Sequence, residues 1–291
     1  IVSIGLAYFI SRLISKPIEE IHDIIASINE ENIETKRLII PKKNDEFAIV
    51  SQQFNELLDK ISFYIAQQKH FVEDVSHELR TPVAIVEGHL KLLNRWGKDD
   101  PEVLEESLTA SLAEIKRMKT LVQEMLDLSR APQVREQYKD AKTEVVATVE
   151  QIVTNFKILY PDFTFIADID TKKEIVSPIY RNHFEQVIII LLDNAVKYST
   201  DRKEIIVSLS PTTEAVEIGI QDFGMGLTEE DKKKVFSRFY RVDKARSRER
   251  GGNGLGLSIA KELIEGYNGK ISLTSRLNHG SLFKVKLPIE K

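Results

Sequence analysis

The sequence predicts a multidomain protein in which two helical bundles precede an α+β sandwich domain. Three observations lead to this fold class. The chain has 291 residues, more than a single domain usually contains. As far as about residue 129, apolar residues recur at the helical spacing of three and four. Beyond residue 142, β-like runs alternate with helical stretches, which is typical of a sheet covered by helices.

The composition is that of a folded protein and excludes several classes of function. Hydrophobic residues make up 42% and charged residues 30% of the chain, near the averages of globular proteins. The net charge of −4 gives no broad cationic field, so we expect no direct binding of nucleic acid. The absence of cysteine excludes disulfides and thiolate metal sites, and it agrees with a reducing cytoplasm.

The first ten residues, IVSIGLAYFI, are almost wholly apolar. A membrane crossing needs about 20 such residues. Residues 1–14 therefore fit the last half of a transmembrane helix, with Arg12 and Lys16 as its flanking charges. This interpretation places the protein at the cell membrane, with residues from about 12 onward in the cytoplasm. The start of an ordinary buried helix is the alternative.

Residues 15–68 are expected to hold two short amphipathic helices, separated by a polar connector that contains Pro41. Their apolar residues step by three and four: Ile18, Ile21, Ile25 and Ile28, then Phe47, Val50, Phe54, Leu57, Ile61 and Tyr64. Two such helices cannot bury both stripes against each other. Pairing with a second chain in a parallel four-helix bundle is therefore predicted. A coiled coil without a signalling role is the alternative.

Residues 69–130 are expected to form a helical hairpin. Its first helix runs from about 67 to 95 and stops at Gly97, which we expect to adopt the left-handed conformation of a C-cap. Asp100 is suited to cap the second helix, with Pro101 at the first helical position. The apolar stripe of the second helix comprises Leu104, Leu108, Leu112, Ile115, Met118, Val122 and Met125. Two such hairpins would form an antiparallel four-helix dimerisation bundle.

Residues 131–141 are expected to form a linker, and residues 142–291 the α+β sandwich domain. Helical stretches are predicted near 145–159, 182–198 and 254–267, and β-like runs begin at 163, 204, 215, 270 and 281.

The stretch FVEDVSHELRTP places His77 on a helix with Glu78 directly after it. An exposed histidine beside a glutamate is usually only a solvated pair. A phospho-acceptor histidine, however, needs one neutral nitrogen for attack and a proton acceptor for the other, and Glu78 is a candidate for that base. Arg80 can orient the carboxylate or meet phosphate oxygens. Thr81 lies one turn beyond His77, where its hydroxyl can position a water, and Pro82 can kink the helix.

The segment LLDNAVKYS places Asn194, Lys197 and Tyr198 on one face of a helix, at positions i, i+3 and i+4. The uncharged amide oxygen of Asn194 suits Mg²⁺, which keeps water and phosphate oxygens as its other ligands. Lys197 can neutralise phosphate. An ordinary surface helix is the alternative.

Two glycine-containing segments follow. In DFGMG, Asp222 can accept a hydrogen bond from the amino group of adenine and would repel the carbonyl oxygen of guanine. Gly224 and Gly226 let backbone approach a ligand closely, although a simple turn is an equal interpretation. The second segment, GGNGLGL, opens a helix whose first backbone N–H groups form an anion site. We assign four of its residues to nucleotide binding: Gly252, Gly254, Leu255 and Gly256.

A polar segment with a basic run lies between the two glycine segments. It contains Phe236, Phe239 and Tyr240, then Lys244, Arg246, Arg248 and Arg250. We expect a mobile lid here, with Arg246 reaching the γ-phosphate. Core packing of the aromatic residues and a solvated charge run are the alternatives.

The run from His77 to Pro82, HELRTP, is identical to the H-box of the HisKA-type sensor histidine kinases of bacterial two-component systems. The segments around Asn194, Asp222 and Gly254 resemble the N, G1 and G2 boxes of the GHKL ATP-binding fold, and the aromatic residues before the basic run resemble its F-box. Residues 15–68, with a proline in the first helix and Glu46 opening the second, resemble a HAMP signal-relay domain.

The resemblance implies ATP and Mg²⁺ as cofactors and a dimeric membrane protein. It implies that His77 is phosphorylated, that Glu78 accepts its proton and that the phosphoryl group passes to an aspartate of a cognate response regulator. Thr81 is implied in dephosphorylation of that regulator.

The sequence departs from the family at two positions. Asn253 stands where Thr or Ser is common, and Ile190 stands where many members carry a second asparagine ligand. The GHKL ATPases of the gyrase or chaperone kind place a water-activating glutamate at this second position, so Ile190 argues against that class. A degenerate kinase that serves only as a dimeric scaffold is a further alternative, which the intact H-box and glycine boxes disfavour.

Overall fold

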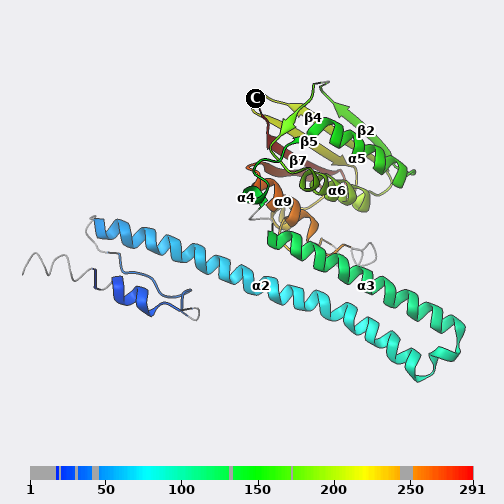
Figure 1. Ribbon diagram of the computed structural model, residues 1–291, viewed down its shortest axis with the longest axis horizontal. Coiled ribbons are helices and arrows are strands. Elements are labelled where there is room, and N and C mark those ends of the chain that lie inside the picture. The colour runs from blue at the N-terminus through cyan, green and yellow to red at the C-terminus, as the bar shows by residue number, and fades with distance from the viewer. Residues whose placement is uncertain are drawn as a thin grey trace, which may run out of the picture. The chain divides into compact units, whose positions relative to one another are not determined.

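The computed structural model describes residues 18, 19, 21–29, 32–40, 46–130, 134–171, 173–242 and 252–290. The chain divides into two compact units, residues 1–77 and 78–291, and each is described by itself (Figure 1). The expected membrane segment, residues 1–14, lies outside the described residues. Within the described ranges, none of the helices has the length and apolar character that a membrane crossing requires.

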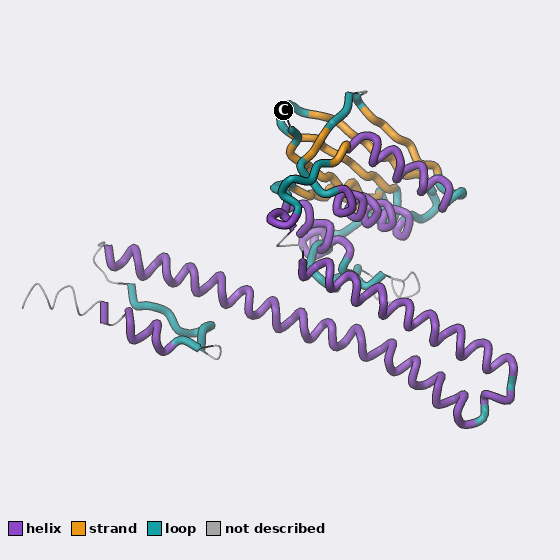
Figure 2. The backbone as a smooth tube through the Cα atoms, viewed as in Figure 1, coloured by secondary structure: helices purple, strands orange, loops and turns teal. Residues whose placement is uncertain are grey.

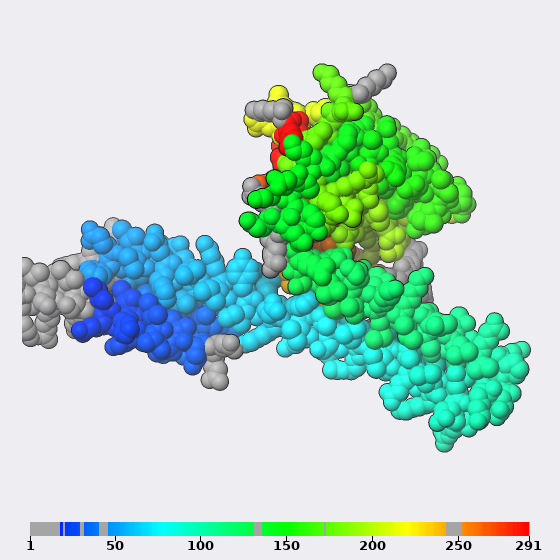
Figure 3. Space-filling view, in the orientation of Figure 1, coloured from blue at the N-terminus to red at the C-terminus, as the bar shows by residue number. Residues whose placement is uncertain are grey.

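In the first unit, an extended connector follows a short helix at residues 21–27 and lies along the beginning of helix α2 (Glu46–Arg95). Figure 3 shows the connector in dark blue against the lighter blue of α2. The Asn55 amide holds the backbone of Leu38 from both sides: its Nδ2 donates to Leu38 O at 2.9 Å and its Oδ1 accepts from Leu38 N at 2.8 Å. The side chains of Leu38 and Leu58 are both buried.

Helix α2 is one continuous helix of 50 residues, so the second apolar stripe and the first hairpin helix belong to a single element. The helix continues through Pro82 without a break. After Arg95 the chain enters a short 3₁₀ helix, Gly97–Asp99.

The expectation of a left-handed C-cap at Gly97 is wrong, because Gly97 is not among the glycines with positive φ. A Cβ at this position would lie only 2.7 Å from Val103 Cγ1 and 3.3 Å from Leu92 O. The turn therefore requires glycine because there is no space for a Cβ atom, and not because the backbone adopts a positive φ.

Helix α3 (Pro101–Arg130) begins as the sequence predicts. Asp100 Oδ1 accepts from the backbone N–H groups of Glu102 at 3.0 Å and Val103 at 3.4 Å. Pro101 occupies the first helical position, where no N–H is needed. These contacts confirm the N-cap and fix the direction in which α3 leaves the turn.

The C-terminal part is a two-layer α/β structure (Figure 2). Its five-stranded sheet has the order β2-β4-β5-β7-β6, in which β2 is parallel to β4 and the other pairs are antiparallel. The strands are β2 (Thr164–Ile169), β4 (Glu204–Pro211), β5 (Ala215–Asp222), β6 (Lys270–Arg276) and β7 (Gly280–Pro288). All five coincide with predicted β-like runs.

Three helices cover one face of this sheet: α5 (Val145–Leu159), α6 (Arg181–Tyr198) and α9 (Gly256–Gly266). The inner strand β4 alternates, with Ile205, Val207 and Leu209 fully buried. Helix α6 meets this face with Phe184, Val187, Ile188, Leu191 and Leu192, all fully buried. The buried layer holds α6 rigidly, so the opposite face of its last turns is presented at a fixed place.

Four short elements were not predicted: α4 (Val134–Gln137), β1 (Thr143–Glu144), β3 (Val176–Ser177) and α7 (Glu229–Lys234). Each is too short to show a periodic pattern. Helix α4 lies in the expected linker, and β1 pairs antiparallel with β3.

Candidate functional site

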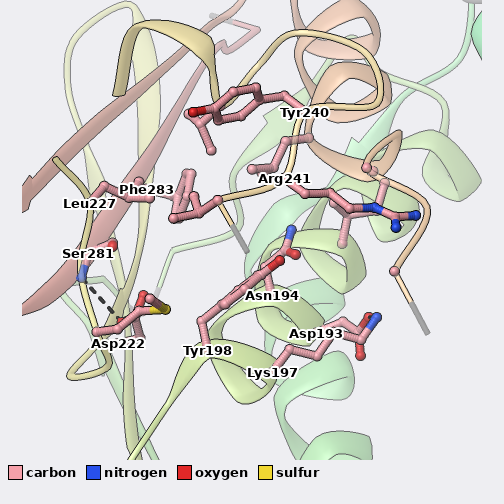
Figure 4. A pocket seen from close by; sticks show the side chains of 18 of the residues that line it. Asp193, Asn194, Lys197, Tyr198, Asp222, Leu227, Tyr240, Arg241, Ser281 and Phe283 are labelled. Carbon is pink, nitrogen blue, oxygen red and sulfur yellow. Dashed lines mark hydrogen bonds and ion pairs between the residues drawn. The ribbon is translucent and has the colours of Figure 1, made fainter. Parts of the chain in front are cut away.

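A pocket lies where the C-terminal half of α6 meets the start of α9 and the adjoining ends of β5 and β7 (Figure 4). Its walls come from α6, from the turn after β5, from β7, from the segment that follows α7, from the glycine loop before α9 and from one residue of α3. The lining residues are Glu124, Ile190, Asp193, Asn194, Lys197, Tyr198, Thr200, Asp222, Met225, Gly226, Leu227, Val235, Tyr240, Arg241, Val242, Gly252, Asn253, Gly254, Gly256, Leu257, Ser281 and Phe283.

Helix α6 brings Asn194, Lys197 and Tyr198 to the pocket together, as their spacing predicts. The ammonium of Lys197 lies 2.6 Å from Asp193 Oδ2, one turn earlier on the helix. This ion pair holds a cation beside the amide of Asn194. Anionic oxygens entering the pocket here would meet the ammonium group of Lys197 and the donor NH₂ group of Asn194, whose amide oxygen suits a cation instead.

Asp222 lies at the other side of the view in Figure 4. Its side chain is 4% exposed, and its Oδ1 accepts from Gly224 N at 2.9 Å and from Ser281 N at 3.2 Å. Burial raises the pKa of this carboxyl group, and the two backbone hydrogen bonds partly oppose the rise. A carboxylate whose Oδ1 is held in this way presents Oδ2 as an acceptor for a donor on the ligand.

The glycines of the DFGMG turn serve backbone packing. A Cβ on Gly224 would lie 2.0 Å from Tyr198 O, and Gly224 is not among the lining residues. Gly226 has a φ of 62°, lines the pocket, and would place a Cβ 2.0 Å from Arg276 O. These close approaches set the turn against α6 and β6, which positions Asp222.

The glycine loop brings Gly252, Gly254 and Gly256 to the pocket, whereas Leu255 is fully buried beneath it. Gly254 has a φ of 75°, and a Cβ there would lie 2.8 Å from the backbone of Phe239. Gly256 begins α9, and its Cβ position is 3.2 Å from Ile190 Cγ2. Backbone N–H groups at this helix start are suited to bind an anion. Arg246 lies outside the described residues.

Three charged residues of the pocket were not assigned from the sequence: Asp193, which pairs with Lys197 on the same helix, and Arg241 and Glu124, which come from other segments. Arg241 precedes the predicted basic run, and its Nη2 lies 3.4 Å from Glu78 Oε2 of α2. Glu124 of α3 accepts from Asn253 Nδ2 at 3.2 Å, and burial raises the pKa of its carboxyl group. Neither belongs to an apolar stripe or a glycine motif, so only the fold brings them here.

The H-box residues occupy consecutive turns of α2. His77 is the last residue of the first unit and is exposed to solvent, as are Arg80 and Thr81. The Glu78 side chain, in the second unit, is 27% exposed. His77 is thus accessible to a reaction partner.

Taken together, the pocket has two chemically different ends. At one end a buried carboxylate offers an acceptor between aliphatic and aromatic walls, which fits a flat base that carries an amino group. At the other end a lysine, an asparagine and helix N-terminal N–H groups fit a chain of phosphates. The arrangement suits an adenine nucleotide.

Two family models match the chain. Residues 67–133 match the His Kinase A (phospho-acceptor) domain, and residues 180–291 match the histidine kinase-, DNA gyrase B- and HSP90-like ATPase domain.

Among curated proteins, the signal transduction histidine-protein kinase ArlS of Staphylococcus epidermidis is 38% identical over 289 residues, which are 99% of this chain and 63% of that protein. The chain thus spans less than two thirds of this relative.

Solved structures share the fold. The histidine kinase AdeS of Acinetobacter baumannii has a TM-score of 0.56 and 24% identity, covering 74% of this chain and 98% of that one. The histidine kinase ThkA, crystallised in complex with the response regulator protein TrrA, has a TM-score of 0.61 and 22% identity, covering 78% of this chain and 63% of that one.

Proposed function

We propose that this chain, which belongs to the HisKA-type sensor histidine kinases of two-component systems, binds ATP in the pocket beside α6 and transfers its γ-phosphoryl group to His77. The bond from the γ-phosphorus to the oxygen that bridges to the β-phosphate breaks, and a bond from phosphorus to an imidazole nitrogen forms. ADP leaves with the bridging oxygen. The proton on the other imidazole nitrogen passes to Glu78, the neighbouring carboxylate.

The observation that carries this proposal is the composition of the pocket. Asp222 offers an acceptor to the adenine amino group, while Asn194, Lys197 and the glycine loop face the phosphates. The position from which related ATPases activate water holds Ile190, packed against Gly256. An aliphatic side chain cannot accept a proton, so the pocket is built to present a nucleotide rather than to hydrolyse it.

Mg²⁺ fits the phosphate end of the pocket. The amide oxygen of Asn194 is a hard, uncharged ligand of the kind that Mg²⁺ accepts beside phosphate oxygens and water. When bound, the ion neutralises charge on the phosphates and on the departing ADP. Lys197, held by Asp193, contributes a fixed positive charge to the same end.

We further assign an aspartate of a cognate response regulator as the second acceptor. ThkA, which shares this fold, was crystallised with such a regulator. The exposed hydroxyl of Thr81, one turn after His77, can position a water for dephosphorylation of that aspartate. The same helix would then serve transfer and phosphatase reactions.

A homodimer is the state in which we expect the chain to act. The hairpin of α2 and α3 leaves large apolar side chains exposed, among them Leu90 at 52%, Leu112 at 65% and Ile115 at 52%. A second hairpin would cover them in an antiparallel four-helix bundle. Residues 69–130 then form the dimerisation and phosphotransfer domain, and residues 142–291 the ATP-binding domain.

The N-terminal segments are assigned to signal relay. The pairing of Asn55 with Leu38 fixes the connector along α2, which agrees with a HAMP domain at residues 15–68. The apolar run at residues 1–10 supports a membrane anchor that ends near residue 14.

Transfer of label from γ-labelled ATP to the whole chain tests the proposed function. The wild type should acquire an acid-labile, base-stable label, as expected of a phosphoramidate, and His77→Gln should acquire none. His70→Gln is the matched control, because His70 is exposed on the same helix two turns earlier and should leave labelling unchanged. Persistent label on His77→Gln would refute the assignment. The labelled wild type, offered a panel of response regulators, should pass its label to an aspartate.

A further inference from the structure

Helix α3 reaches the nucleotide pocket with a charged side chain that the proposed reaction does not use. Glu124 is among the residues that line the pocket. One turn later on the same helix, Asp127 Oδ2 accepts from Gln186 Nε2 of α6 at 2.7 Å. The two acidic residues therefore meet different parts of the nucleotide-binding domain: Asp127 holds α3 against α6, and Glu124 enters the pocket.

Inside the pocket, Glu124 accepts a hydrogen bond from a side-chain donor of the glycine loop. Asn253 lies between Gly252 and Gly254, is 4% exposed, and donates from Nδ2 to Glu124 Oε2 at 3.2 Å. Its Oδ1 is also buried and has no hydrogen-bond partner among the described residues. The Asn253 amide thus makes only some of the hydrogen bonds that it could make, and its partner in this arrangement is the Glu124 carboxylate.

The carboxylate also lies in the field of the cations that face the phosphate end. Burial raises the pKa of the Glu124 carboxyl group most strongly, and the charge of Asp127 adds to the rise, while the hydrogen bond from Asn253 and the charges of Lys197 and Arg241 lower it. A carboxylate beside a lysine, an arginine and an amide donor occupies surroundings that an anionic phosphate would also favour. An ATP polyphosphate needs the same donors, and its negative charge would be repelled by Glu124 in a partly buried site.

Resting on the proposed function, we propose that Glu124 is an internal competitor of the polyphosphate, so that docking of α3 on the nucleotide-binding domain and binding of ATP exclude one another. The side chain takes the place of phosphate oxygens at Asn253 when α3 is docked. ATP entry releases Glu124 and, with it, the contact between Asp127 and Gln186. Nucleotide binding thereby frees the domain from α3.

A reversible cross-link tests this exclusion on the whole chain. The sequence contains no cysteine, so Asp127→Cys with Gln186→Cys places one thiol on each side of this contact, and a reducible bis-methanethiosulfonate reagent can span the gap that the two longer side chains fill. The link within one chain would hold α3 docked and leave Glu124 and the pocket intact. Linking should weaken ATP binding at least about tenfold, and reduction of the link should restore it. Adenosine, which lacks phosphates, should bind the linked and reduced forms equally.

The charge of Glu124 is tested separately. Glu124→Gln keeps the size of the side chain and removes the charge, so it should strengthen ATP binding several-fold in the unlinked chain and restore most of the affinity lost in the linked one. Adenosine affinity should not change. Glu106→Gln is the matched control, because Glu106 is exposed on the same helix and carries the same charge. It should leave ATP affinity as in the wild type.

The outcomes separate the two proposals. Equal ATP affinity in linked and reduced chains that both bind adenosine would overturn the competition and leave the kinase assignment standing. An equal gain in ATP affinity for Glu106→Gln would also overturn it, because a general charge effect would then explain the result. A chain that binds neither adenosine nor ATP, linked or reduced, would instead refute the proposed nucleotide site and the competition together.

Discussion

Replacing Asp222 by asparagine exchanges one hydrogen-bond acceptor of the pocket for a donor at nearly constant volume. Asp222 Oδ1 accepts from Gly224 N and Ser281 N at 2.9 and 3.2 Å, and the asparagine carbonyl oxygen can keep both bonds. The second oxygen, which faces the ligand in our account, becomes an NH₂ group. The fold around the turn should therefore survive while the chemistry presented to the base is inverted.

The expected loss follows from the charge of the acceptor. A hydrogen bond to a charged group contributes about 1.5–3 kcal/mol, and in the variant the adenine amino group would face another donor. ATP affinity should fall by about 10- to 100-fold, since about 1.4 kcal/mol corresponds to a factor of ten. The affinity for GTP should rise, because the carbonyl oxygen of guanine can accept a hydrogen bond from the new NH₂ group.

Isothermal titration of the whole chain with ATP and GTP measures both affinities. Asp168→Asn is the control, because Asp168 lies exposed on β2 and its substitution removes the same charge. A parallel loss of ATP and GTP binding in Asp222→Asn would mean that the pocket had collapsed. Unchanged ATP affinity would mean that Asp222 does not contact the base, and either result would refute the reasoning.

The same variant has a predicted dependence of stability on pH. Burial raises the pKa of the Asp222 carboxyl group above its ordinary value of 3.8. Its contribution to the free energy of unfolding is then fully present below pH 3.8 and is lost as the pH rises through the folded-state pKa. Asparagine cannot ionise, so the variant should gain stability relative to the wild type between acidic and neutral pH. Amide hydrogen exchange in β4 and β5 measures this, and a pH-independent difference would contradict it.

Four further substitutions follow from the same structure. Thr81→Ala should keep autophosphorylation and lose dephosphorylation of the regulator, since only the second reaction needs a positioned water; equal loss of both activities would count against this role. Gly226→Ala, with its Cβ 2.0 Å from Arg276 O and a φ of 62°, should unfold the turn or cost several kcal/mol, about 1 of them from the backbone conformation alone. Gly88→Ala, in open space on α2, should instead raise the free energy of unfolding by about 0.5–1 kcal/mol, as measured in thermal melts. A greater loss of stability in Gly88→Ala than in Gly226→Ala would refute the steric argument. Asp100→Ala should cost about 1 kcal/mol in urea unfolding through loss of the N-cap, and no change would show that the cap is dispensable.

Periodicity predicted the parts of the fold that bury one face of a long element. The five strands of the sheet, α5, α6 and α9 all showed patterns of sufficient length, and Asp100 with Pro101 showed a local cap that depends on neighbouring residues only. Short elements such as β1, β3 and α7 gave no pattern. Strands β1 and β3 form because each offers backbone partners to the other, whereas α7 begins at a local capping box between Thr228 and Asp231.

The site was predictable where neighbours in sequence act together. Asn194, Lys197 and Tyr198 share a helical face, and all three line the pocket. Residues that depend on distant contacts were not predictable. Glu124 reaches the pocket only because α3 packs on α9, and Gly97 is required by a contact with Val103 that its own sequence context does not reveal.

The central claim is that the γ-phosphoryl group passes to His77 and not to water. One reaction tests it: label bound to protein and label released as inorganic phosphate are measured together, for the wild type and for His77→Gln, with γ-labelled ATP and Mg²⁺. Wild-type label should accumulate on the protein, whereas His77→Gln should bind ATP yet yield neither bound label nor appreciable phosphate, since Ile190 offers no base. Phosphate release by His77→Gln as fast as the wild type acquires label would contradict the claim and make the chain an ATPase.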